Sequence, residues 1–422
     1  PANDANNAEI DTRYVDVDSD SSTFDSSSSN LALAAGSSIK KAYLYWQGLA
    51  SADDYPLATK IKLKVPNSSN YIAIQANDSK VNWSQYKNYF PYQATADITE
   101  YVKSSGIYTV ADLFTTEGQV SGLGTFGAWS IVVVYENKNK TLKNVSVYDG
   151  YTVIDENNEQ TISLSGFLTP TNGVVNSKFL VFAGEGDVDI FGDYIELDGT
   201  TLKRNAQDDG NNAFNASITE NGGYVTARNP NCQNNLGIDI HSYDVGTNGQ
   251  GVIGNDQSST TIKLGSSQDQ YYPSVFAFST ELYIPDVCYE EKYTVDGEVP
   301  SQILATDILD MEVYITNKNF EPAKGVSIKK VFGHSNEYER NSTAKFESGS
   351  FVSKSDSQGD DIAYYLDDEN TLIINLGDGA NSISGGDISK DQNETFLYSF
   401  SPVNDGNITS YYLVSYRDDS GA

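Results

Sequence analysis

The chain has 422 residues, of which 58 are acidic and 27 basic, so its formal net charge is −31. A surface this acidic repels nucleic-acid backbones and anionic membranes, which excludes nucleic-acid binding. The apolar residues include 29 Tyr and 17 Phe but one Met, and aromatic residues spaced by Ser, Thr, Asn and Asp favour pleated strands and polar turns. We therefore expect an all-β protein with a large core.

The chain contains no run of about eighteen apolar residues, and its first residues lack the basic start and apolar middle of a signal peptide. We expect a mature or trimmed chain without a membrane span. Its two cysteines, Cys232 and Cys288, are too few for a disulfide scaffold or a zinc cage. They predict either one disulfide, worth about 4 kcal/mol in an oxidising compartment, or two free, buried thiols.

Three aspartates alternate near the start of the chain: Asp16, Asp18 and Asp20. On an extended segment their carboxylates share one face, and in a loop they converge on a hard cation, which predicts a calcium (Ca²⁺) site. The helix-loop-helix version of such a site is excluded, because Ser21 and Ser27 stand where it requires Gly and Glu. A solvated acidic turn is the alternative interpretation.

The next elements follow from periodicity. Residues 38–48 carry apolar side chains on both faces and predict a strand between two layers. Residues 61–65 alternate cleanly and, with residues 71–74, predict a hairpin. Residues 96–102 predict a short helix, because Asp97 and a glutamate three positions later form a capping box.

Two aromatic residues between these elements, Trp83 and Tyr86, lie in a polar stretch. If their rings are exposed, they offer platforms on which sugar rings stack, which predicts a candidate ligand site. Buried rings are the alternative.

Residues 126–151 predict the hairpin around which the protein is organised. Trp129 and the run Ile131 to Tyr135 are apolar at consecutive positions, so both faces of this strand should be covered, which places it centrally between two layers. A polar loop over residues 136–140 then leads into an alternating second strand.

Strand-like runs recur from residue 160 to residue 284, and Asn, Asp and Gly clusters separate them. Asp187 and Asp189 share one face of such a run. This pattern predicts either the exposed face of a strand, which is the commoner case, or a small cation site. Asp239 is placed to orient His241, although a surface histidine beside a carboxylate is the commoner arrangement.

No motif for nucleophilic or metal catalysis is present, so we expect a protein that is not an enzyme. Glycoside hydrolysis needs two carboxylates, which an acidic chain always has, so a carboxylate-based hydrolase stays the third hypothesis.

Several sequence runs occur in a shared order over nearly 300 residues. They are YVDVDSDSSTFDSSSSNL (14–31), AYLYWQG (42–48), ADITEYV with GIYTVAD (96–112), AWSIVVVYEN with NVSVYDGY (128–151), GEGDVDIFGDYI (184–195), LGIDIHSYDV (236–245) and YYPSVFAFSTELYIP (271–285). This series resembles the amino-terminal region of large secreted bacterial surface proteins. Residues 308–328 and 371–401 are similar to the Ig-like repeat, of the domain-of-unknown-function type, that follows this region in them. An acidic stretch over residues 356–369 departs from the repeat's pattern.

The resemblance implies an extracellular or cell-surface location and a structural or adhesive role, without catalytic residues. We expect a large antiparallel, jelly-roll-like sandwich over residues 1–287 and an Ig-like β-sandwich over residues 288–422. The leading hypothesis is a matrix or fibre protein that associates with itself, with other surface proteins or with glycans. Strand complementation would use the chain ends, residues 1–9 and 408–416. A calcium-assisted carbohydrate-binding adhesin is the alternative.

Overall fold

The computed structural model describes residues 4–77, 81–170, 173–282, 285–304, 307–319, 321–332, 344–346, 351–354, 359–366, 370–402 and 410–417. The chain divides into two compact units, Pro1–Leu282 and Tyr283–Ala422. This division lies five residues before the boundary expected after residue 287. In the described residues, no helix is long and apolar enough to cross a membrane.

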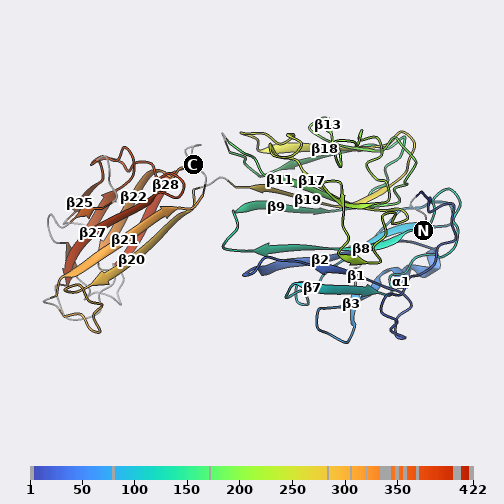
Figure 1. The fold of residues 1–422 in the computed structure, drawn as a ribbon, viewed down its shortest axis with the longest axis horizontal. Coiled ribbons are helices and arrows are strands. Elements are labelled where there is room, and N and C mark those ends of the chain that lie inside the picture. The colour runs from blue at the N-terminus through green and yellow to red at the C-terminus, as the bar shows by residue number, and fades with distance from the viewer. Residues whose placement is uncertain are drawn as a thin grey trace. The chain divides into compact units, whose positions relative to one another are not determined.

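The first unit contains four sheets, coloured blue to yellow in Figure 1. Sheet I has the order β16 (Arg228–Asn229), β1 (Ser26–Leu31), β7 (Gly106–Ala111), β3 (Lys60–Lys64), β4 (Ile72–Gln75). Sheet II has the order β5 (Val81–Trp83), β6 (Phe90–Asp97), β2 (Ser38–Ala50), β8 (Gly127–Glu136). Sheet III has the order β15 (Gly223–Tyr224), β14 (Ile218–Glu220), β17 (Ile238–Asp244), β11 (Ser177–Gly184), β19 (Tyr272–Glu281), β9 (Lys143–Asp149). Sheet IV has the order β10 (Gln160–Ser165), β18 (Ser259–Gly265), β12 (Tyr194–Leu197), β13 (Thr200–Thr201). A 3₁₀ turn (Ala52–Asp54) and α1 (Tyr55–Ala58) follow β2.

The four sheets stack in the order I, II, III, IV (Figure 1), and one hydrophobic core lies between each neighbouring pair. Strands in the two middle sheets are therefore apolar on both faces. On β2, Leu44 and Trp46 enter the core shared with sheet I, while Tyr45 enters the core shared with sheet III. On β11, Phe179 faces sheet IV and Phe182 faces sheet II. Alternation along a strand sends successive side chains to opposite faces, so one strand contributes to two cores. The coverage expected for residues 38–48 is confirmed.

The hairpin expected over residues 126–151 is wrong. β8 pairs with β2 in sheet II, whereas β9 pairs with β19 in sheet III. Each of the two is the last strand of its sheet, so the loop between them crosses from one layer to the next. The apolar run of β8 is covered only in part: Trp129 packs toward sheet I and Val132 toward sheet III, but no residue of β8 is fully buried. The facing sheets I and III provide this cover, so apolar side chains on both faces do not require β8 to be a central strand of its own sheet.

The short helix expected over residues 96–102 is also wrong. Residues 90–97 form β6, and a single turn follows, in which the amide of Thr99 donates to Asp97 Oδ1 over 2.9 Å. Asp97 does cap, but it caps a single turn. The residues before this turn are held extended because β6 pairs with β2. The expected hairpin of residues 61–65 and 71–74 is confirmed by the pairing of β3 with β4.

The second unit is a sandwich of two sheets around one core. One sheet has the order β20 (Val287–Thr294), β21 (Leu309–Asn317), β27 (Asn393–Pro402), β23 (Ala344–Phe346), with β24 (Val352–Ser353) also on β27. The other has the order β25 (Ile362–Leu366), β26 (Thr371–Asn375), β22 (Lys324–Phe332), β28 (Ser410–Arg417). The acidic stretch 356–369 lies partly outside the described residues. Both units confirm the all-β class built from antiparallel sandwiches.

Candidate binding cleft

The three aspartates expected to bind calcium are engaged by the protein itself. Asp18 pairs with Lys64 and accepts a hydrogen bond of 2.7 Å from the Tyr71 hydroxyl, while Ser26 Oγ donates to Asp16 Oδ1 over 2.7 Å. Burial alone raises the pKa of Asp18, but the hydrogen bonds from Lys64, Tyr71 and Ser26 outweigh it and hold the pKa below its usual value. Asp20 accepts the amide of Ser22 over 2.9 Å. The geometry is that of an internally paired acidic turn.

The aromatic pair expected to stack on sugars is packed into the protein. The Trp83 ring lies 5.3 Å from the Tyr92 ring and joins the core between sheets I and II. Tyr86 packs against the core between sheets II and III. Both residues are half-buried, so neither offers an open platform.

Both cysteines are free in the structure. Cys232 belongs to the first unit and Cys288 to the second, and each is half-buried. The expected disulfide is therefore absent, and the alternative of two free thiols describes the structure.

The expected pair of Asp239 and His241 exists, but it is not on the surface. His241 Nε2 lies 3.1 Å from Asp239 Oδ1, and its Nδ1 lies 2.8 Å from Thr219 Oγ1. Both side chains are fully buried, so a substrate cannot reach them. The pair positions strands β14 and β17, which carry Thr219 and His241.

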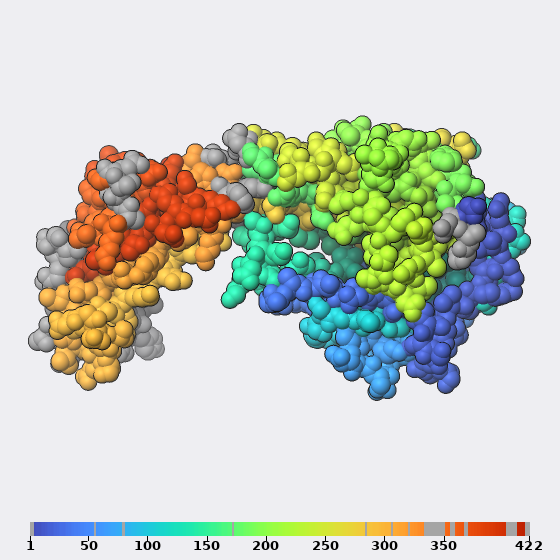
Figure 2. All heavy atoms as spheres, viewed as in Figure 1, coloured from blue at the N-terminus to red at the C-terminus, as the bar shows by residue number. Residues whose placement is uncertain are grey.

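A cleft of about 640 Å³ opens inside the first unit between sheets I, II and III. In Figure 2 the surface is hollowed where the blue and teal N-terminal residues meet the green residues of sheet III. Its volume lies within the range of about 300–1,000 Å³ typical of ligand sites. This cleft, concave and lined by residues of three sheets, is therefore the candidate functional site.

The cleft runs along the open edge of β8. Every residue from Phe126 to Ile131 lines it, and because neighbouring side chains point to opposite faces, an unbroken run means that the main chain itself faces the cleft. In the described part of the chain, β2 is the only strand that pairs with β8. The main-chain groups on the outer edge of β8 are therefore available for pairing.

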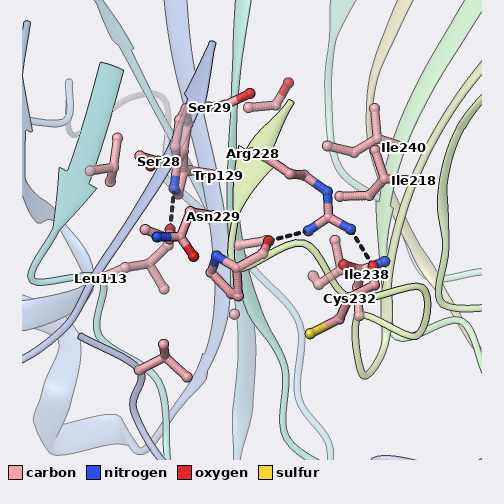
Figure 3. Close-up of a pocket in the computed structure, with 18 of the residues that line it drawn as sticks. Ser28, Ser29, Leu113, Trp129, Ile218, Arg228, Asn229, Cys232, Ile238 and Ile240 are labelled. Carbon is pink, nitrogen blue, oxygen red and sulfur yellow. Dashed lines mark hydrogen bonds between the residues drawn. The ribbon is translucent and has the colours of Figure 1, made fainter. Parts of the chain in front are cut away.

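The roof of the cleft is one face of sheet III. Ile238 and Ile240 of β17, with Leu180 of β11 and Ile218 of β14, line it, and Figure 3 shows the three isoleucines together on one side of the site. Sheet II ends at β8, but sheet III continues beyond β11 through β17 and β14. An apolar face therefore overhangs the place where a further strand of sheet II would lie.

Sheet I and segment 225–236 form the opposite wall. Residues 26–31 of β1 line the cleft without interruption, and β16 covers part of that edge by pairing with Ser28 and Ser29. Trp129 Nε1 donates to Ser27 Oγ over 2.7 Å and so joins the walls made by β8 and β1 (Figure 3). The cleft is thus apolar above and rich in hydroxyl groups below.

Two cationic residues, Arg13 and Arg228, line the cleft of this acidic molecule. The Arg228 guanidinium donates to the carbonyl oxygens of Pro230 over 2.7 Å and of Cys232 (Figure 3). Its Nε donates to the carbonyl oxygen of Val225 over 3.1 Å. Burial lowers the pKa of Arg228. The three bonds fold segment 225–236 around its side chain. Asp25 also lines the cleft, and burial raises its pKa to about 7.

The sequence alone did not identify this cleft. Its walls come from residues 26–31, 126–133 and 218–242, which are far apart in the chain and meet only because the sheets stack. The one available signal was the doubly apolar run of residues 131–134, which required cover on both faces.

No protein-family model matches the chain, and no curated protein matches it. Among solved structures, the crystal structure of mavirus major capsid protein is similar over 66% of this chain and 86% of that chain, at 9% sequence identity and a TM-score of 0.14. A score this low supports no argument about fold or function.

Proposed function

We propose that the protein is a non-enzymatic, extracellular adhesive protein that binds an extended peptide segment of a partner protein in the cleft, as an added strand on β8. The observation that carries the proposal is the open edge of β8 beneath the overhanging face of sheet III. Its acidic, β-rich composition and the resemblance to secreted surface proteins support the extracellular location.

Strand addition fits the chemistry of the walls. Peptides that add to a sheet edge gain affinity from main-chain hydrogen bonds and specificity from pockets for alternate side chains. Here β8 supplies the main-chain groups, and Ile238 and Ile240 supply an apolar surface for every second side chain of the incoming strand. The serine-rich strand β1 lines the opposite wall and would meet the remaining ones.

In the described residues, both ends of the chain are held within their own units. β28 pairs with β22 inside the second unit, and the described N-terminal residues are docked in the first, where Asn234 Nδ2 donates to the Ala5 carbonyl over 2.7 Å. Exchange of a terminal strand between copies, one version of the fibre hypothesis, therefore has no free donor in the described residues. A segment of another surface protein fits the site better. Carbohydrate binding has less support, because Trp83 and Tyr86 are packed into cores.

A random twelve-residue peptide library displayed on phage tests the proposal on the full chain. We expect enriched peptides to alternate β-branched and polar residues, and bound peptide to protect the amides of β8 from hydrogen exchange. Ile240→Arg places a charge in the roof and should weaken binding at least about tenfold, since a desolvated charge costs more than about 1.4 kcal/mol. Ile107→Arg is the control, because Ile107 is 60% exposed on β7, outside the cleft.

A second arm uses the thiol in the wall. In a Cys288→Ser background, a bulky maleimide on Cys232 should block peptide binding, because Cys232 lines the cleft. Enrichment of no peptide, or protection confined to strands other than β8, would refute the proposal. Equal binding by the Ile240→Arg and Ile107→Arg variants would do the same.

A further inference from the structure

Five acidic side chains gather on the other side of sheet III, away from the cleft. Asp239 lies on β17 and points to the face opposite Ile238 and Ile240. The others come from loops next to β11, β12 and β18, and all five are between 0% and 4% exposed: Glu185, Asp187, Asp193, Asp239 and Asp269. The expectation that Asp187 and Asp189 stand on an exposed strand is wrong for the strand and for Asp187: residues 185–193 form a loop in which Asp187 is buried, although Asp189 is exposed.

Short contacts show that these side chains are neighbours. The Asp187 amide donates to Asp269 Oδ2 over 3.4 Å. A Cβ atom at Gly186 would lie 2.3 Å from Asp239 Oδ2, so only glycine fits there. Glu185 has a φ of 75°, and its amide donates to the Gly237 carbonyl over 2.5 Å. This strained backbone holds the Glu185 side chain inside.

The described residues provide little positive charge for this cluster. The only salt-bridge contact to it joins His241 to Asp239, and nearby Arg204 pairs with Asp208 at 2.9 Å. Ionised carboxylates buried without cationic partners are costly, so a bound cation would stabilise this cluster.

A neutral side chain provides an independent sign of a ligand. Asn212 is 4% exposed, and its Nδ2 donates to the carbonyl oxygens of Asp187 and Val188, each over 3.2 Å. Its Oδ1 is buried beside the cluster and has no partner in the described structure. Protonation cannot explain this atom, since an amide oxygen does not titrate. Unpartnered oxygens of Glu185, Asp187, Asp193 and Asp239 lie in the same region.

We propose that this cluster binds a calcium ion, with Glu185, Asp187, Asp239, Asp269 and Asn212 as the oxygen donors. Carboxylate and amide oxygens without thiol or imidazole donors are the ligand set of a hard cation, and calcium tolerates the irregular geometry of loop ligands better than magnesium. No three of the acidic side chains in the described residues are already spaced as ligands of one ion. Binding therefore draws them inward by rotation of their side chains.

A second cavity gives the ion an approach. It has a volume of about 400 Å³ and is lined in part by Asn212 and Ser217. The Ser217 amide donates to Asp239 Oδ1 over 3.0 Å, so this cavity reaches the edge of the cluster. Bound calcium would tie the loops after β11 and β18 to β17.

Calorimetric titration of the full chain, freed of metal with EDTA, with CaCl₂ tests the site, and MgCl₂ is the comparison. We expect one site for calcium. At a hundredfold excess over the dissociation constant, the melting temperature of the first unit should rise by about 5 °C. The double variant Glu185→Gln, Asp187→Asn should lose both the heat of binding and the shift.

Two controls keep the test decisive. In EDTA the double variant should melt no lower than the natural protein, because amides of equal size replace buried charges, so loss of binding will not reflect unfolding. The double variant Asp16→Asn, Asp20→Asn removes two charges of the acidic turn and should bind calcium normally. The proposal fails if 10 mM CaCl₂ gives no heat and no thermal shift, or if only the Asp16, Asp20 variant loses binding.

Discussion

Arg228→Lys should destabilise segment 225–236 in the wall of the cleft without changing the packing of the hydrophobic cores. The guanidinium donates to the carbonyl groups of Val225, Pro230 and Cys232, and its planar fork reaches all three at once. A lysine ammonium keeps the charge but reaches one of them from a flexible stem. We therefore expect segment 225–236 to lose its anchor while β1 and β8 keep their packing.

The magnitude follows from the two lost bonds. Hydrogen bonds to charged groups are worth about 1.5 kcal/mol or more each, so the change should cost about 3 kcal/mol. For a unit of this size, about 2 °C per kcal/mol gives a melting temperature about 6 °C lower. Calorimetry measures this shift, and hydrogen exchange should show faster exchange over residues 225–236.

The matched control is Arg13→Lys. Arg13 pairs with Asp11 at 2.6 Å, but their side chains are 65% and 62% exposed, so this substitution should have almost no effect. If Arg228→Lys melts within about 1 °C of the natural protein and segment 225–236 exchanges as slowly as before, Arg228 does not anchor this segment.

Three further predictions concern the core, the pH response and the thiols. Phe179→Ala should destabilise the first unit by about 3–5 kcal/mol in urea, because Phe179 is fully buried and stacks on Phe276 at 5.8 Å; a loss below about 1 kcal/mol would contradict this packing. Burial raises the pKa of Asp25 to about 7, so the folded state binds more protons than the unfolded state between pH 4 and 7, and stability falls as pH rises through that window. Asp25→Asn should remove up to about 1.4 kcal/mol per pH unit of that fall in urea titrations, and an unchanged pH slope would exclude the assignment. Cys232 and Cys288 are free, so the unfolded chain should yield two reactive thiols without reductant. If no thiol reacts, the two cysteines form a disulfide instead.

The buried pair of Asp239 and His241 shows how far local sequence reasoning extends. Their spacing put both on one strand face, and the structure places Nε2 of His241 at 3.1 Å from Asp239. Sheet IV covers that face and so removes it from solvent, and this sheet is formed by residues 160–165, 194–201 and 259–265. A pattern of two residues contains no information about such a distant cover.

The acidic residues illustrate the same limit. Asp16, Asp18 and Asp20 alternate visibly, yet Lys64, Tyr71 and Ser26 satisfy them. The five buried acids are scattered over residues 185–269, where no spacing marks them in a chain with 58 acidic residues. Only burial distinguishes the two groups, and burial is a property of the assembled sheets.

Local sequence patterns were enough to predict the strand-forming runs, the all-β class and the positions that need apolar cover on both faces, because side-chain alternation and turn chemistry act over a few residues. The tertiary structure decided which strands pair, that β8 and β9 belong to different sheets, and where the cleft and the buried acids lie. Pairing joins residues separated by 88 to 103 positions, as β11 and β19 show. Such contacts depend on how whole layers stack, which no local pattern specifies.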